Sequence, residues 1–297
     1  RQRKGVHIAL RFCAHPVSGG YSSHPRRTSR PEIDMHRTPA LAPDTTIAIV
    51  GAGRLGGVLA RALRAAGLVV RGPLRREDSM PDADIALLCV PDSAIAAVAF
   101  AVRPHARLVA HVSGATPLTD VDFSLHPLQT FTGKETSEVF RGIGVAVDGR
   151  TPEALEVAEA LARVIGANPF HIDDAHRGEY HAAASFASNF VLTVLDAAEH
   201  LAKDAGIDRA YLAPLVRQTV DNWAARGAAS SLTGPIARGD EATVARQRAA
   251  SGDYRDLFDA LATATRAVAG RAPHATAHTT ADHAATQQTA VTEEPQA

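Results

Sequence analysis

One junction in the sequence constrains the fold more than any other feature. Residues 45–50 read Thr-Thr-Ile-Ala-Ile-Val, a β-branched run that predicts a buried strand, and they lead directly into the glycine-rich segment 51–56. Apolar residues with helical spacing follow as far as Gly67, and residues 68–71 then predict a second strand. This order predicts an α/β Rossmann domain, in which a doubly wound parallel sheet is covered by helices.

The glycine-rich segment suits the diphosphate of a dinucleotide. Gly51 allows the tight turn, Gly53 lets the backbone approach a diphosphate, and Gly56 lets the helix pack closely on the strand. The N-terminus of the helix then faces the anion. The alternative is a glycine-rich turn without a ligand. We expect a dinucleotide site that includes Gly51, Ala52, Gly53, Arg54, Leu55 and Gly56.

The end of the second strand distinguishes the two nicotinamide cofactors. Enzymes that use NAD carry an Asp or Glu about 20 residues after the first glycine, where it binds the ribose hydroxyls. This chain has Arg71 there, followed by Arg75 and Arg76. Guanidinium groups suit a 2′-phosphate, so we expect NADP. The alternative is that these arginines belong to a solvated surface loop.

Two further strands, predicted at residues 84–90 and 108–112, add to the same sheet. Loops that follow the carboxyl ends of such strands line the crevice that holds the nicotinamide. We therefore expect Val90, Pro91 and Ser113 at the cofactor. Cys89, inside the apolar run, is interpreted as a small buried hydrophobe rather than a nucleophile.

A histidine lies at a break in the next strand-like segment. Residues 123–131 are interrupted at Pro127, directly after His126. A histidine at a strand end near the nicotinamide can orient or protonate a substrate, but a capping or backbone-bonded role fits equally well. Strands at 143–147 and 169–172, on either side of a helix at 152–165, complete the predicted first domain.

From Asp174 the apolar period becomes helical, and one helix is predicted to run to about Ala205. Most of its circumference is apolar, which predicts burial among other helices. His181, Ser185 and Asn189 recur at i, i+4 and i+8, so they form one polar line. This line either bonds to neighbouring helices or lines a wet substrate pocket.

The rest of the chain predicts three more helices and two disordered ends. The helices fall at about 211–226, 240–250 and 254–269, and the loop between the first two offers Ser231 and Thr233 as substrate-binding hydroxyls. We expect a Rossmann domain at 45–172 and a helical domain that closes over a small substrate at 173–270. Residues 1–44 and 271–297 are expected to be disordered, and Met35 is a candidate start.

Composition excludes several classes of function. The formal net charge is −1, which gives no sign of a nucleic-acid or membrane partner. No apolar stretch is long enough to span a bilayer. The two cysteines, Cys13 and Cys89, are not expected to pair, which favours a reducing, cytoplasmic compartment. No metal site is expected, because the tail histidines His274, His278 and His283 lie in a polar segment.

Several motifs together resemble those of Rossmann-like proteins that carry a DUF2520 domain. The resemblance covers about residues 45–270. It rests on the glycine-rich segment and on Val112–Ala115, Leu125–Phe131, Tyr180–Ala184, Ala187–Asn189 and Leu232–Asp240.

The resemblance implies a build similar to ketopantoate reductases, pyrroline-5-carboxylate reductases and β-hydroxyacid dehydrogenases. Such proteins pair a Rossmann domain with an all-α domain like the C-terminal domain of 6-phosphogluconate dehydrogenase, often as a homodimer. It further implies an NADP-dependent oxidoreductase that reduces a small 2-oxo acid or imine acid, with 2-oxopantoate as the named candidate.

One departure from those relatives concerns the proton donor. Asn189 matches their asparagine, but Ser185 stands where they have a lysine, and no lysine occurs between Lys134 and Lys203. His126 or His181 is the candidate replacement. Ser231 corresponds by position to the serine that holds the substrate carboxylate in ketopantoate reductases. The missing lysine also leaves a non-catalytic NADP-binding sensor or scaffold as the alternative function.

Overall fold

The structure is a computed structural model, and it describes residues 41–42 and 44–271. The two segments predicted to be disordered, 1–44 and 271–297, lie almost wholly outside the described residues. Cys13, Met35 and the tail histidines lie outside them as well.

A seven-stranded sheet forms the first part of the described chain, with the order β2-β1-β3-β4-β5-β6-β7. Its strands are β1 (Thr46–Val50), β2 (Val69–Leu74), β3 (Ala83–Leu88), β4 (Ala106–His111), β5 (Phe123–Pro127), β6 (Gly144–Gly149) and β7 (Asn168–His171). Strands β1 to β5 are parallel, as a Rossmann domain requires. This part of the predicted fold is confirmed.

The last two strands depart from the predicted all-parallel sheet. β6 runs antiparallel to β5, and β7 runs parallel to β6, so both oppose the other five. The connection from β5 to β6 contains only a short 3-10 turn at Ser137–Phe140. An antiparallel neighbour needs no crossover helix, which explains why a loop is sufficient here.

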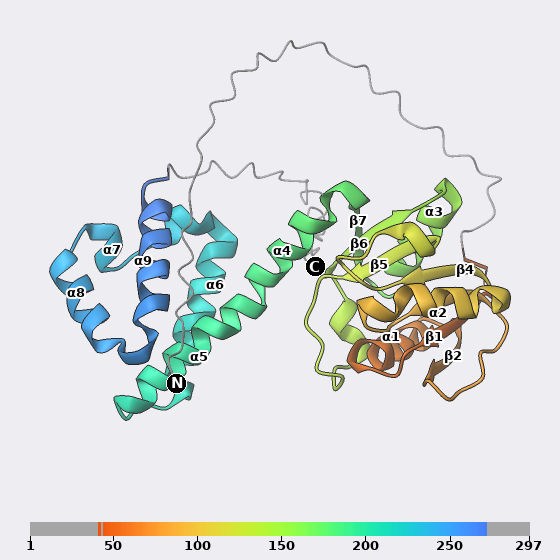
Figure 1. Ribbon diagram of the computed structural model, residues 1–297, viewed down its shortest axis with the longest axis horizontal. Helices are drawn as coiled ribbons and strands as arrows, with labels where there is room; N and C mark the ends of the chain where they lie inside the picture. Colours follow the sequence, from red (N-terminus) through yellow and green to blue (C-terminus); the bar gives the residue numbers. More distant parts are fainter. Residues whose placement is uncertain (1–40, 43, 272–297) are drawn as a thin grey trace, which may run out of the picture.

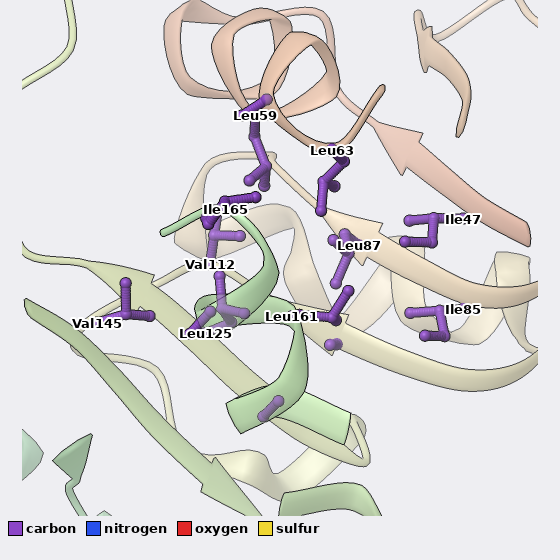
Figure 2. Close-up of a cluster of buried hydrophobic side chains, with 14 of the residues drawn as sticks. Ile47, Leu59, Leu63, Ile85, Leu87, Val112, Leu125, Val145, Leu161 and Ile165 are labelled. Atoms are coloured by element: carbon purple, nitrogen blue, oxygen red, sulfur yellow. The ribbon is translucent and has the colours of Figure 1, made fainter. Parts of the chain in front are cut away.

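Helices cover both faces of the sheet (Figure 1). The helices α1 (Arg54–Ala65) and α3 (Pro152–Val164) enclose the larger core, and α2 (Ile95–Val102) packs on the opposite face. Figure 2 shows the larger core, where Leu59 and Leu63 of α1 lie near Leu87 of β3 and Leu161 of α3 lies on the same side. These side chains are at most 1% exposed, so burial of apolar surface fixes the two helices to the sheet.

Only helices follow the sheet in the described chain. They are α4 (Arg177–Ala187), α5 (Asn189–Asp204), α6 (Arg209–Ser231), α7 (Pro235–Arg238), α8 (Glu241–Ala250) and α9 (Arg255–Ala269). In Figure 1, α4 leads away from the sheet and α5 to α9 form a separate helical group. α6 contains a break at Gly227, where φ is 75°.

The prediction of one continuous helix from Asp174 to Ala205 is wrong. The segment is divided into α4 and α5 at Ser188, whose φ of −128° and ψ of −74° are not helical. The predicted burial of this segment is also wrong within the single chain. Phe186 of α4 is 69% exposed and Leu192 of α5 is 64% exposed, although α4 contacts α5 and α5 contacts α6.

Candidate active site

The turn between β1 and α1 is closed by contacts that only glycine permits. Gly51 has a φ of 114°, and a β-carbon there would lie 2.3 Å from the carbonyl oxygen of Cys89. A β-carbon at Gly56 would lie 2.0 Å from the Gly51 carbonyl oxygen. The chain therefore folds back on itself here as the motif predicts.

Gly53, unlike Gly51 and Gly56, has free space at the position of its missing side chain. It is the N-cap residue of α1, and no atom lies within 4 Å of the place where its β-carbon would be. No side chain caps this helix, and its first turn contains no acidic residue. The first turn of α1 therefore has neither a side-chain cap nor a carboxylate of its own, which fits the diphosphate of a dinucleotide at the positive end of the helix dipole. Ala52 and Arg54 flank this opening and are exposed, whereas Leu55 packs against the core.

Strand register separates the three candidate arginines. Arg71 pairs with Ala48, in the middle of β1, whereas Leu74 pairs with Val50 at its end. The Gly51 N–H also donates to the Leu74 carbonyl at 2.8 Å. Arg75 and Arg76 therefore follow the end of β2 beside the glycine turn, and both are exposed. Of the three, these two are best placed for a 2′-phosphate, while Arg71 lies further back along the strand.

The loop after β3 borders the same turn. The Cys89 N–H donates to the Val50 carbonyl at 2.7 Å, which aligns the ends of β3 and β1. Val90 and Pro91 follow at the carboxyl edge of the sheet. Burial raises the pKa of the Cys89 thiol to about 12. At neutral pH the thiol is protonated, and Cys89 is partly buried against the larger core, which agrees with its interpretation as a small hydrophobe rather than a nucleophile.

Ser113, after β4, holds its own loop together. Its buried Oγ accepts hydrogen bonds from the N–H groups of Ala115 at 3.1 Å and Thr116 at 3.0 Å. The fully buried His111 supports this turn, because its Nδ1 accepts from the Ser113 N–H and its Nε2 lies 3.3 Å from the Pro117 carbonyl. The Ser113 Oγ therefore shapes the wall of the crevice.

The next strand end carries a group of aromatic and imidazole rings. His126 of β5 has its Nδ1 2.6 Å from the Tyr180 hydroxyl of α4. The ring centroid of His181 lies 6.2 Å from that of His126. Gly114 covers His126 so closely that a β-carbon on the glycine would lie 2.9 to 3.0 Å from ring atoms. The structure thus brings together His126, His181 and the loop of Ser113.

Sequence reasoning missed Tyr180. The only signal was its position directly before His181 in the motif Tyr180–Ala184. Partial burial raises the pKa of Tyr180 to about 12, and burial lowers the pKa of His126 to about 4, aided by the nearby His181 and Arg177. At neutral pH both groups are uncharged, so each can donate or accept a hydrogen bond.

A buried arginine fixes the start of α4. Arg177 is 3% exposed, and its guanidinium donates to Ser124 Oγ at 2.7 Å, Asp148 Oδ2 at 3.3 Å and Asp174 Oδ1 at 2.6 Å. Ser124 and Asp148 are register partners on β5 and β6. Tyr180 lies about one helical turn after Arg177, so this ion pair network sets its position beside His126.

The other predicted site residues are not brought into this group. Ser185 lies about one helical turn beyond His181 on α4, and Asn189 begins α5, on the far side of the break at Ser188. Ser231 ends α6, and its Oγ donates to the Asn222 carbonyl at 2.7 Å. Thr233 follows in an exposed loop of the helical group. Their proposed roles toward a substrate rest on the family resemblance.

Metal binding and membrane spanning were the two remaining questions for the described residues. No group of three or more His, Cys, Asp or Glu side chains among them is arranged to hold a metal ion. Nor is any helix within 41–42 and 44–271 both long enough and apolar enough to cross a membrane.

Comparison with known proteins confirms the resemblance indicated by the motifs. Residues 143–265 match the family described as a domain of unknown function, DUF2520. The match begins with β6, well before the predicted domain boundary at residue 173, so the two strands of reversed direction belong to the matched segment. No curated protein matches the chain.

Solved structures share the fold over three quarters of the chain. Protein BF3122 of Bacteroides fragilis, described provisionally as an NADP oxidoreductase, is 22% identical over 76% of this chain and 99% of that one, with a TM-score of 0.67. Protein TM1727 of Thermotoga maritima is 23% identical over 75% and 97%, with a TM-score of 0.60. Plasmodium falciparum pyrroline carboxylate reductase, solved with NADP bound, is 11% identical over 76% and 99%, with a TM-score of 0.50.

At these identities the likeness establishes the architecture. The chain shares with these structures a Rossmann domain followed by a helical domain.

Proposed function

We propose that this protein is an NADP-dependent oxidoreductase that reduces a small 2-oxo acid or imine acid, with 2-oxopantoate as the first candidate. The observation that carries the proposal is one shared edge of the sheet. The open N-terminus of α1 follows β1, and the His126–Tyr180 pair lies at the end of β5, on the same carboxyl edge. An anion site and a proton-carrying pair at this edge suit a reductase.

Each part of the crevice has a role toward the cofactor. Gly51, Gly53 and Gly56 form the turn and free N–H groups that hold the diphosphate, and Arg75 and Arg76 supply positive charge for a 2′-phosphate. When bound, the reduced nicotinamide supplies the hydride. Val90, Pro91 and the Ser113 loop form the wall of the crevice beside it.

The choice of 2-oxopantoate rests on the resemblance to ketopantoate reductases. The test is NADPH oxidation, followed by absorbance, with 2-oxopantoate, other 2-oxo acids and cyclic imine acids. We expect turnover with at least one member of this panel and faster turnover with NADPH than with NADH. Binding of NADPH without turnover on any member would contradict the proposal.

A specific observation favours the alternative of an NADP-binding sensor. Ser185 replaces the lysine of the dehydrogenase relatives, and Asn189 begins α5, separated from His181 on α4 by the break at Ser188. The variant Asn189→Ala distinguishes the two functions. In a reductase it lowers turnover much more than NADPH affinity, whereas in a sensor there is no turnover to lose.

We also propose that the working form is a homodimer joined through α4, α5 and α6. Four aromatic side chains on these helices are largely exposed: Phe186 (69%), Phe190 (49%), Tyr211 (78%) and Trp223 (57%). At about 200 Å² for each aromatic side chain, they expose roughly 500 Å². Leu192 and Leu215, 64% and 66% exposed, add to this surface.

The area of this surface supports a second copy of the chain as its proposed occupant. A stable interface buries about 800 Å² on each partner, and monomers rarely expose apolar patches larger than a few hundred Å². The exposed side chains of α4 to α6 approach that area. A twofold dimer uses the same patch on both copies, so it covers both apolar surfaces at once.

A further inference from the structure

A short hydrogen bond connects Tyr180 with His126. It joins the phenol oxygen to the imidazole Nδ1 at 2.6 Å, and the two rings meet edge to face with centroids 5.5 Å apart. Tyr180 comes from α4 and His126 from β5, 54 residues earlier. A contact this short between distant segments requires both side chains to be held in place.

Each member of the pair is held by separate neighbours. Phe170 of β7 packs against the Tyr180 ring with a centroid separation of 5.9 Å, and Arg177 anchors the preceding turn of α4. Gly114 covers the His126 ring, where even a β-carbon would collide. The phenol is therefore presented in one orientation beside the loop that follows β4.

We propose that Tyr180 donates the proton to the substrate oxygen and that His126 is the positioning residue that orients its hydroxyl. This inference rests on the proposed function. Together they take the place of the lysine that the dehydrogenase relatives use. With Nδ1–H of the neutral His126 donating to the phenol oxygen, the Tyr180 O–H is free to donate to a ligand.

The reaction balances with NADPH as the reductant. The carbonyl carbon gains a hydride, the electron pair of the C=O π bond moves to oxygen, and this oxygen takes the proton of the Tyr180 hydroxyl. The resulting phenolate accepts the Nδ1–H bond of His126 until a proton from water restores the phenol. The net change is a carbonyl, NADPH and one proton converted to an alcohol and NADP.

The charges around the pair support this direction of transfer. Burial is the main cause of the low pKa of His126; His181, Arg177 and His111 lower this pKa further, whereas Asp92 raises it. The imidazole is therefore neutral near pH 7. A phenol whose pKa is about 12 remains protonated until a stronger base, such as a developing alkoxide, is beside it.

The first experiment measures turnover of the full-length protein with NADPH and 2-oxopantoate, or with whichever acid of the panel is reduced. Tyr180→Phe removes only the hydroxyl and keeps the ring packing. We expect it to lower kcat by about 10²-fold or more while the NADPH Kd stays within threefold. Tyr254→Phe is the control, because Tyr254 also lies beside a histidine ring, that of His200, in the helical group.

The second experiment needs no turnover. ¹⁵N spectra of histidine in the apo-protein report the tautomer and the pKa of His126. We expect a neutral His126 above about pH 5 with one dominant tautomer, and mixed tautomers in Tyr180→Phe. If Tyr180 had only a structural role, Tyr180→Phe would not lower kcat while leaving the NADPH Kd unchanged.

The two experiments separate failure of this inference from failure of the proposed function. Full activity of Tyr180→Phe, or a His126 spectrum that Tyr180→Phe leaves unchanged, overturns the proton role. If His181→Asn loses activity a hundredfold while Tyr180→Phe remains active, His181 is the proton donor. That result also overturns the proton role of Tyr180. A wild-type protein that reduces no member of the panel contradicts the proposed function and, with it, the proton role. The His126 spectrum then shows separately whether the pair itself exists.

Discussion

Gly56 faces Gly51 so closely that a β-carbon at position 56 would lie 2.0 Å from the Gly51 carbonyl oxygen. The neighbouring Gly57 is different, since its β-carbon would meet only the end of the Arg61 side chain at 3.7 Å. We expect Gly56→Ala to lower the free energy of unfolding by about 1–3 kcal/mol, because the backbone must shift. Gly57→Ala should raise it by up to about 1 kcal/mol through helix propensity. Urea denaturation compares them, and equal stability of the two variants would contradict the close contact.

Arg75 and Arg76 are expected to set the preference for NADP. The variant that changes both to Ala should weaken NADPH binding by about 10- to 100-fold, since a charge-assisted hydrogen bond contributes about 1.5–3 kcal/mol. NADH binding should change by less than threefold. Arg71→Ala, in mid-strand, is the control and should have the smaller effect. Fluorescence titration measures both affinities, and equal weakening of NADPH and NADH would argue against a 2′-phosphate site.

The buried His126 predicts a loss of stability in mild acid. Its pKa in the folded protein is about 4, below the ordinary 6.5, so the unfolded chain binds more protons between these values. Stability is therefore complete above pH 6.5 and falls as the pH drops to 4, by at most about 3 kcal/mol from this group. Urea denaturation at pH 7, 5.5 and 4.5 measures this slope. His126→Asn should flatten it in part, because His111 has a lowered pKa as well. An unchanged slope would show that His126 does not titrate as described.

The proposed dimer predicts a specific effect of charge on the exposed helices. Replacing Phe186 and Phe190 together by Asp should yield a monomer, because buried carboxylates oppose the interface. Phe100→Asp on α2 is the matched control, since Phe100 is 86% exposed but lies outside the helical group. Light scattering after gel filtration should give twice the 31.2 kDa chain mass for wild type and the control. A monomeric wild type would refute the dimer.

Much of the first domain follows from local sequence signals. The β-branched run before Gly51, the helix that follows and the alternation of later strands predict β1 to β5 and their helices, because parallel strands are buried on both faces. The reversed direction of β6 and β7 could not be predicted in this way. The apolar residues of β6 and β7 suit a buried strand of either direction. The direction is set by how the loop from Leu128 to Ile143 returns to the sheet.

The candidate site was predictable only in part. The glycine turn and His126 carry signals in the sequence, whereas Tyr180 needs the tertiary contact between α4 and β5 to be recognised. Counting residues selects Arg71, but the irregular register between Ala48 and Val50 places Arg75 beyond the end of the strand. The break at Ser188 is also invisible in the sequence, because the residues on both sides of it favour a helix.

The most direct test of the central claim is calorimetric titration of the full-length protein with NADPH. We predict saturable binding by wild type and at least tenfold weaker binding by Gly53→Glu, a difference of about 1.4 kcal/mol. The carboxylate in this variant repels the diphosphate, while the fold has room for it because nothing lies within 4 Å of the β-carbon position. The melting temperature should therefore stay unchanged. No heat of binding with wild type, or equal affinity in both proteins, would contradict a dinucleotide site at the start of α1.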